Sequence, residues 1–284
     1  MAAQHFYSPD NPSRQSFYRR SLLALHRARI PHLVGGAYAL APYTGIARCT
    51  KDLDIFLRER DCAIALEVLE QTGCRTEVTY PHWLAKALSG RDQIDLIYSS
   101  GNGIAVVDDE WFAHAVPDHV LGVPVQLCPA EEMIWSKAFV MERERFDGAD
   151  VLHLFHTRSA VLDWPRLMRR FEPHWRVLFF HLVLFGYVYP SERAKIPPQV
   201  MEELTRRLNE EQHAVDADDE RVCRGTLLSR AQFLVDIERW EYEDARLDPE
   251  VQMSDENIAQ WTDAIADDVR SYDAQGNHSP GRRS

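Results

Sequence analysis

The sequence has little lysine and no paired cysteines. Its 284 residues include four lysines (Lys51, Lys86, Lys137 and Lys195), so arginine supplies most of the positive charge. Its five cysteines are widely spaced and form no Cys-x-x-Cys pair. This cysteine usage is typical of a reducing compartment, and it gives no support for a zinc site.

Sequence motifs that mark several common enzyme classes are also absent. There is no Gly-x-Ser-x-Gly, Walker A, Gly-x-Gly-x-x-Gly or His-Glu-x-x-His pattern, so serine-hydrolase, P-loop, Rossmann and zinc-protease functions lack support. The most apolar run, residues 177–189, is too short to span a bilayer. The first 15 residues lack the basic and apolar regions of a signal peptide. We therefore expect a cytoplasmic protein with no membrane partner.

The composition is that of a globular protein, with 45% hydrophobic and 27% charged residues. The formal net charge of −12 is unevenly distributed, because residues 1–200 are nearly neutral and residues 201–284 carry most of the excess acid. A strongly acidic protein binds nucleic acid poorly. Since the first 200 residues do not share this acidity, the total charge neither excludes nor favours an RNA substrate.

Hydrophobic patterning changes near residue 130. Before it, helical patterns alternate with strand patterns at 50–57, 75–80, 93–98 and 123–127, and a short apolar strand leads into Gly35. After it, the patterns are helical, at 130–156 with an interruption near Gly148, and at 164–171, 174–187, 198–208 and 224–240. We predict an α+β fold in which a mixed sheet with flanking helices precedes an all-helical part.

This patterning also predicts how the chain is organised. We expect a flexible N-terminus over residues 1–12, an α/β domain over 13–129, a helical domain over 130–242 and an acidic, disordered tail over 243–284. Within the helical part, residues 229–242 have the pattern of an amphipathic helix that packs against the α/β domain. A weaker helical pattern covers residues 257–269.

Two glycines, Gly35 and Gly36, follow the first apolar strand and precede a helical pattern. Glycine lets the backbone approach a ligand closely, and a helix N-terminus presents unpaired N–H groups to phosphate. The alternative is a turn without a ligand, which is the more common meaning of such glycines.

Asp52 and Asp54 are two residues apart on a predicted strand, so their carboxylates project from the same face. Two like charges held together repel each other and raise one pKa unless a cation lies between them. Carboxylate oxygens of this kind suit Mg²⁺ shared with substrate phosphates. The alternative is a strand face exposed to solvent.

Asp95 is a single acid within the apolar strand pattern at 93–98. A buried carboxylate is costly unless it is paired or bound to a metal. If this strand neighbours the strand of Asp52 and Asp54, three carboxylates converge on a site suited to phosphoryl or nucleotidyl transfer, with Asp95 as third ligand or base. The alternative is an edge strand with Asp95 facing water.

Residues 33–97 resemble the nucleotidyltransferase superfamily, which has the fold of DNA polymerase β. They match its pattern of an apolar residue, two glycines, a short helix, Asp-x-Asp on a strand and a third acid on a later strand. The run Arg48-x-Thr50-Lys51-Asp52-x-Asp54 is similar to bacterial single-chain members, including the toxin-type AbiEii family. The resemblance implies Mg²⁺, or Mn²⁺ in its place, on the three acids. It also implies nucleotide contacts from Gly35, Gly36, Arg48, Thr50 and Lys51.

The resemblance also gives a role to Lys137, because AbiEii-like members have a lysine early in the helical half that contacts the triphosphate. A compact ammonium group suits phosphate. An Arg- and Asp-containing segment follows, and its Phe146-Asp147-Gly148 insertion leaves open whether Asp147 or Asp150 is the equivalent acid. The alternative for Lys137 is a surface lysine paired with a nearby glutamate.

The function implied by the resemblance is a Mg²⁺-dependent nucleotidyltransferase. Such an enzyme moves a nucleoside monophosphate group from a nucleoside triphosphate, such as ATP, to an acceptor hydroxyl and releases pyrophosphate. The acceptor stays open between a tRNA end, a protein hydroxyl and a small molecule such as an aminoglycoside. The alternative is a nucleotide-binding or toxin–antitoxin interaction module with little catalysis and an antitoxin as partner. The presence of all three acids disfavours that alternative.

Overall fold

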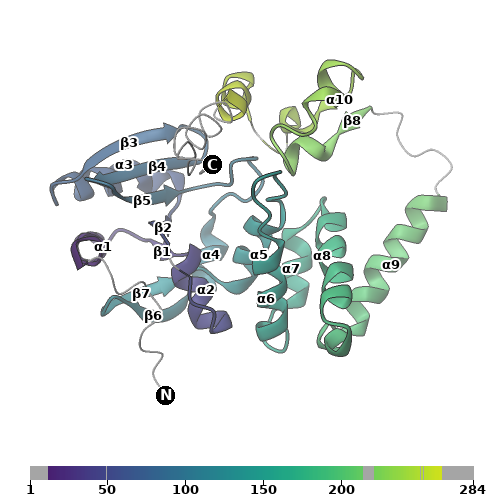
Figure 1. The fold of residues 1–284 in the computed structure, drawn as a ribbon, viewed down its shortest axis with the longest axis horizontal. Coiled ribbons are helices and arrows are strands. Elements are labelled where there is room, and N and C mark those ends of the chain that lie inside the picture. Colours follow the sequence, from purple (N-terminus) through teal and green to yellow (C-terminus); the bar gives the residue numbers. More distant parts are fainter. Residues whose placement is uncertain (1–11, 49, 214–220, 250, 252, 264–284) are drawn as a thin grey trace, which may run out of the picture.

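The computed structural model describes residues 12–48, 50–213, 221–249, 251 and 253–263. A mixed sheet forms in the part of the chain before residue 130, and helices follow it (Figure 1). This arrangement confirms the predicted α+β fold class. One apolar core includes buried residues from both parts, from Phe17 to Leu204. The division into two domains at residue 130 stays a prediction.

The large sheet has seven strands in the order β3-β4-β5-β2-β1-β7-β6. β2 lies between β5, to which it is parallel, and β1, to which it is antiparallel. The predicted strands are present, and the sheet contains two more, β4 and β6. The strands are β1 (Leu33–Val34), β2 (Asp52–Phe56), β3 (Arg75–Tyr80), β4 (Leu84–Ser89), β5 (Asp92–Ile97), β6 (Val116–Val120) and β7 (Val123–Leu127).

The two faces of β2 and β5 differ in polarity because side chains alternate along a strand. Leu53, Ile55, Ile94 and Leu96 are fully buried and join the main core. Helices α1 (Pro12–Arg27) and α3 (Glu59–Glu70) pack on each other and against strands of the sheet. The opposite face of β2 and β5 carries the acidic side chains, beside α2 (Gly36–Thr44).

The helical part begins as the sequence predicts. The pattern over 130–156 is interrupted before Gly148, so α5 and α6 are separate helices joined by residues 139–147. Its helices are α5 (Ala130–Ala138), α6 (Gly148–Arg158), α7 (Trp164–Arg170), α8 (Trp175–Val188) and α9 (Pro198–His213), with the 3₁₀ turn η1 (Pro190–Lys195) after α8. The short helix α4 (Asp109–Ala113) lies earlier, between β5 and β6. Among the described helices, none has the length and apolar character needed to cross a membrane.

The helix predicted over 224–240 is wrong. The chain instead forms β8 (Val222–Cys223), the 3₁₀ turn η2 (Arg224–Leu227) and the short helix α10 (Leu234–Glu238). The chain turns back on itself here, and the ring of Phe233 lies against Gly225. A Cβ on Gly225 would be only 2.3 Å from this ring, so the close approach requires glycine. No residue of α10 is buried, so the predicted amphipathic helix over 229–242 does not form or pack on the sheet domain.

Part of the predicted disordered tail is folded. β9 (Glu243–Asp244) pairs in parallel with β8, the 3₁₀ turn η3 (Ala245–Leu247) follows, and residues 255–263 are mostly helical. Val251 and Met253 are buried in a second small core. These few apolar side chains anchor the acidic stretch to the rest of the protein. The average composition of residues 243–284 does not predict this anchoring. Residues 264–284 of the predicted tail and residues 1–11 lie outside the described residues.

Trp261 attaches this C-terminal helix to the sheet. Its ring centroid lies 5.3 Å from that of Tyr80 and 5.1 Å from that of Trp83, in edge-to-face geometry. Gly101 lies beneath the ring, where a Cβ would approach it to 2.3 Å. Residues 255–263 thus close over the β3–β4 turn.

We expect Trp261→Ala to lower the free energy of unfolding by about 2 kcal/mol, less than for a fully buried tryptophan because the side chain is partly exposed. Urea denaturation followed by circular dichroism measures this change. Trp240→Ala is the matched control, because Trp240 is 57% exposed. Equal stability of the two variants would contradict the attachment.

Candidate active site

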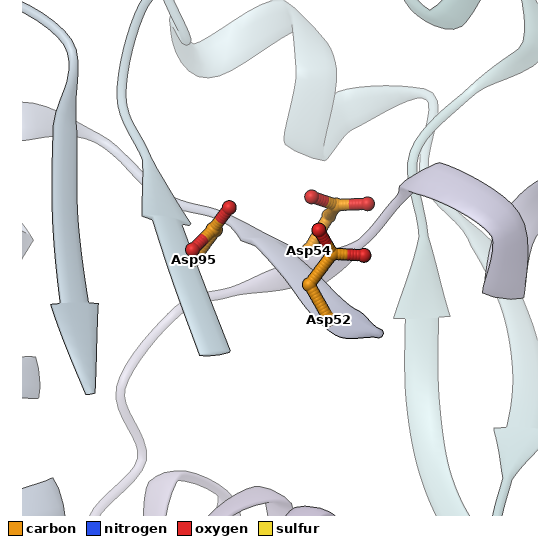
Figure 2. Close-up of side chains that lie close together, drawn as sticks. All are labelled: Asp52, Asp54 and Asp95. Atoms are coloured by element: carbon orange, nitrogen blue, oxygen red, sulfur yellow. The ribbon is translucent and has the colours of Figure 1, made fainter. Parts of the chain in front are cut away.

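Two neighbouring strands bring the three predicted acids together. Asp52 and Asp54 share a face of β2, and Asp95 on β5 is the register partner of Asp54. One carboxylate oxygen of each lies within 4.8 Å of the others (Figure 2). In the part of the chain that the structure describes, this is the one such cluster of acidic, histidine or cysteine side chains. The edge-strand alternative for Asp95 does not hold, since β5 lies between β4 and β2.

Two acids of the cluster have raised pKa values. Burial, followed by the charges of Asp52 and Asp95, raises the pKa of Asp54 to about 7, against a smaller opposing effect of Lys137 and Arg145. Burial also raises the pKa of Asp95 to about 6, although Lys86 opposes this. Closely spaced carboxylates with raised pKa values favour a bound divalent cation. The all-oxygen donor set fits Mg²⁺ or Mn²⁺.

The segment before β2 is held by α1. The guanidinium of Arg14 donates to the carbonyl of Thr50 at 3.2 Å, and the Tyr18 hydroxyl donates to the carbonyl of Lys51 at 3.0 Å. The Thr50 hydroxyl in turn donates to the carboxylate of Asp52 at 2.5 Å. Thr50 therefore orients Asp52, and Lys51 is exposed immediately before the acids.

The two glycines lie against the acid cluster. The N–H of Gly35 donates to the carbonyl of Asp54 at 3.0 Å. Gly36 begins α2 with φ +53°, a left-handed conformation that favours glycine. A Cβ on Gly36 would lie 1.6 Å from the Asp54 carboxylate, and one on Gly35 would lie 2.3 Å from the Phe56 ring. The N-terminus of α2 can reach Asp54 only because both residues lack side chains.

Lys137 lies in a charged network on the helical side. Its Nζ is 2.8 Å from Asp147 and 2.9 Å from Asp150, so both candidate acids contact it. Its partners are therefore these aspartates and not the surface glutamate of the alternative reading. Arg145 binds Asp147 through two hydrogen bonds of 2.9 and 2.8 Å, and Arg48 forms an ion pair with Asp150.

Lys137 and Asp147 are both charged near neutral pH. Burial alone lowers the pKa of Lys137, but Asp147 and Asp150 outweigh it, so the pKa is raised. Burial alone raises the pKa of Asp147, but Arg145 and Lys137 outweigh it and lower the pKa to about 2. The positive charges of Lys137 and Arg145 also lower the pKa of Asp54, against the larger effect of burial.

Two residues near the acid cluster were not predicted. The pKa of Arg145 is raised mainly by its hydrogen bond to Asp147. The negative charges of Asp54 and Asp52 raise it further. Lys86 on β4 is the register partner of Asp95, and its Nζ lies 3.8 Å from an oxygen of that acid. Sequence spacing offered a signal for Arg145, which is two residues before Asp147. For Lys86 the signal is a lone lysine in the apolar stretch that forms β4, a strand that the sequence patterns do not predict.

Comparisons with known proteins give structural similarity alone. No family model matches the chain, and no curated protein matches it. The antibiotic-resistance factor ANT(2'')-Ia is 16% identical over 71% of this chain and 96% of its own, with a TM-score of 0.36. The lincomycin-bound lincosamide adenylyltransferase LnuA is 14% identical over 50% of this chain and 95% of its own, with a TM-score of 0.35. A nucleotidyltransferase-like protein from Paracoccidioides brasiliensis is 14% identical over 64% of this chain and 92% of its own, with a TM-score of 0.42.

Proposed function

We propose that this protein is a Mg²⁺-dependent nucleotidyltransferase. It transfers a nucleoside monophosphate group from a nucleoside triphosphate to an acceptor hydroxyl and releases pyrophosphate. The observation that carries the proposal is the cluster of three carboxylates within 4.8 Å of one another, beside a glycine turn at a helix N-terminus. Such a cluster suits charge neutralisation at a polyphosphate, in which positioning and electrostatics supply most of the catalysis.

Asp52, Asp54 and Asp95 would hold the divalent cation. When bound, the cation neutralises phosphate charge and favours attack at phosphorus. The N–H groups at the start of α2 donate hydrogen bonds to phosphate oxygens. Arg48, Thr50 and Lys51 lie on the segment that leads into the acids and contribute to nucleotide binding.

Lys137 and Arg145 supply positive charge from the helical side of the site. Asp95, a carboxylate of the same cluster, accepts the proton of the acceptor hydroxyl. The hydroxyl oxygen then forms a bond to the α-phosphorus. The bond from that phosphorus to its bridging oxygen breaks, and the electron pair leaves with pyrophosphate.

Incubation with each α-³²P-labelled nucleoside triphosphate tests this function. Mg²⁺ and separate fractions of tRNA, protein and small molecules are supplied, and the fraction that gains label identifies the acceptor class. Asp118→Asn is the matched control for substitutions of the acids, because Asp118 lies on the edge strand β6. If the protein binds nucleotide but no fraction gains label, the proposed enzyme function is wrong and the protein is a nucleotide-binding module.

The raised pKa of Asp54 predicts how the stability of the metal-free protein depends on pH. With its pKa raised from 3.8 to about 7, Asp54 keeps its proton in the folded state over a range where the unfolded chain loses it. The folded state therefore binds more protons between about pH 4 and pH 7, and the metal-free protein loses stability as the pH rises through this range.

We expect Mg²⁺ to raise the thermal midpoint more at pH 8 than at pH 5, because the cation competes with the proton for the acids. Differential scanning calorimetry at both pH values, with Mg²⁺ or with EDTA, measures the effect. Asp118→Asn keeps this pattern and Asp54→Asn reduces it. A Mg²⁺ effect of equal size at both pH values would argue against metal binding at the acids.

A further inference from the structure

A lysine on β4 lies directly beside the third acid of the cluster. Lys86 and Asp95 are register partners across the antiparallel pair β4 and β5, with Nζ 3.8 Å from Oδ1 of Asp95. The two side chains are only 23% and 15% exposed, so solvent screens their attraction less than at the surface. Lys86 is one of four lysines in the chain.

A hydrogen bond from Gln93 reaches the same oxygen. Gln93 precedes Asp95 by two residues on β5, so both side chains project from one face of the strand. Its amide Nε2 donates to Oδ1 of Asp95 at 3.2 Å. Lys86 and Gln93 thus approach Asp95 from neighbouring strands and converge on one carboxylate oxygen.

We propose that Lys86 is a positioning residue that, together with Gln93, holds Asp95 by Oδ1 and directs Oδ2 towards the acceptor hydroxyl. The proposal rests on the proposed function, because it concerns the proton acceptor of that reaction. A carboxylate rotates broadly about its terminal bond. A general base must stay within hydrogen-bond reach of the proton that it removes. The ion pair with Lys86 and the hydrogen bond from Gln93, both at Oδ1, restrict this rotation, so Lys86 acts through Asp95.

The test uses Lys86→Met and Lys86→Arg in the full chain. Steady-state labelling gives kcat and KM, and calorimetric titration with Mn²⁺ in the absence of substrate gives metal affinity. We expect kcat of Lys86→Met to fall about 10- to 100-fold, as for other groups that orient a ligand or base, with little change in KM for the nucleotide. Mn²⁺ should bind at least as tightly as in the unmodified protein, because a positive charge near the site has been removed. Lys86→Arg keeps the charge and should recover part of kcat.

Gln93→Met supplies an independent variant in case Lys86→Met is less stable. It should also lower kcat, and the double variant should lose less than the product of the two single effects, because both residues hold one oxygen. Asp118→Asn again serves as the control.

Three results would overturn the positioning role while the unmodified protein remains active. They are an unchanged kcat in Lys86→Met, a fall of kcat matched by equal losses of Mn²⁺ affinity and thermal stability, and fully independent effects of Lys86 and Gln93. An unmodified protein that labels no acceptor, or an Asp54→Asn variant that still labels one, rejects the proposed nucleotidyl transfer itself. That pattern is distinct from a failure confined to Lys86.

Discussion

Asp54→Asn is expected to lower nucleotidyl transfer by about 10³-fold or more, since a metal-stabilised transition state loses several kcal/mol when a ligand is removed. The amide has the same shape as the carboxylate but carries no charge. Asp54 is central to the cluster, because it is the register partner of Asp95, shares a face with Asp52 and accepts the N–H of Gly35 through its carbonyl. The substitution therefore removes charge and leaves the backbone contacts in place.

The same substitution should raise the stability of the metal-free protein. Burial and the charges of Asp52 and Asp95 make ionised Asp54 unfavourable in the folded state, as its raised pKa shows. A neutral amide relieves this repulsion. We expect Asp54→Asn to melt at a higher temperature than the unmodified protein in EDTA at pH 8, and to gain less from Mg²⁺.

These two readouts distinguish a catalytic loss from a folding defect. Labelling assays give the transfer rate, and calorimetry gives the midpoint with and without Mg²⁺, with Asp118→Asn measured in parallel. Loss of activity together with a lower midpoint in EDTA would indicate a damaged fold. An Asp54→Asn variant with normal activity would falsify the role of the cluster in transfer.

The acids of the site were predictable from the strand patterns in which they lie. Asp95 is a single acid within an apolar strand pattern, and burying a carboxylate is costly without a compensating group. The strand period also places Asp52 and Asp54 on one face without knowledge of the fold. Only the pairing of β2 with β5 had to be supplied by the structure.

The cations around the acids were less predictable, because their positions depend on pairing between strands and on loop conformation. Lys86 reaches Asp95 only because β4 is inserted between β3 and β5. Arg145 reaches Asp147 from the irregular connection between α5 and α6. Neither position follows from local periodicity.

The C-terminal part shows the limits of periodicity more directly. Leu227 is buried in the second small core, whereas Leu228 packs against the main core. The missing side chain of Gly225 leaves room for the ring of Phe233, so the chain folds back here. In the acidic stretch that follows, Trp261 finds its partners Tyr80 and Trp83 far away in sequence. Long-range contacts of this kind override local composition.

Gly36→Ala is expected to lower transfer by about 10²-fold or more, because a displacement of about 1 Å at a catalytic group has an effect of that size. The new Cβ would lie 1.6 Å from the Asp54 carboxylate, so Asp54 must move out of the cluster. The substitution also places an alanine at φ +53°, which costs roughly 1–2 kcal/mol of stability. The two effects must be separated.

Gly45→Ala separates the two effects, because it imposes nearly the same backbone cost at the other end of α2. Gly45 has φ +72°, and a Cβ there would meet nothing within 4 Å. Both variants should lose similar stability in urea denaturation, whereas only Gly36→Ala should lose transfer activity and Mn²⁺ affinity. If Gly45→Ala loses as much activity as Gly36→Ala, strain in α2 explains the loss. If only Gly36→Ala is impaired, the close approach of the α2 N-terminus to Asp54 is required by the site, and the glycine pair serves more than a turn.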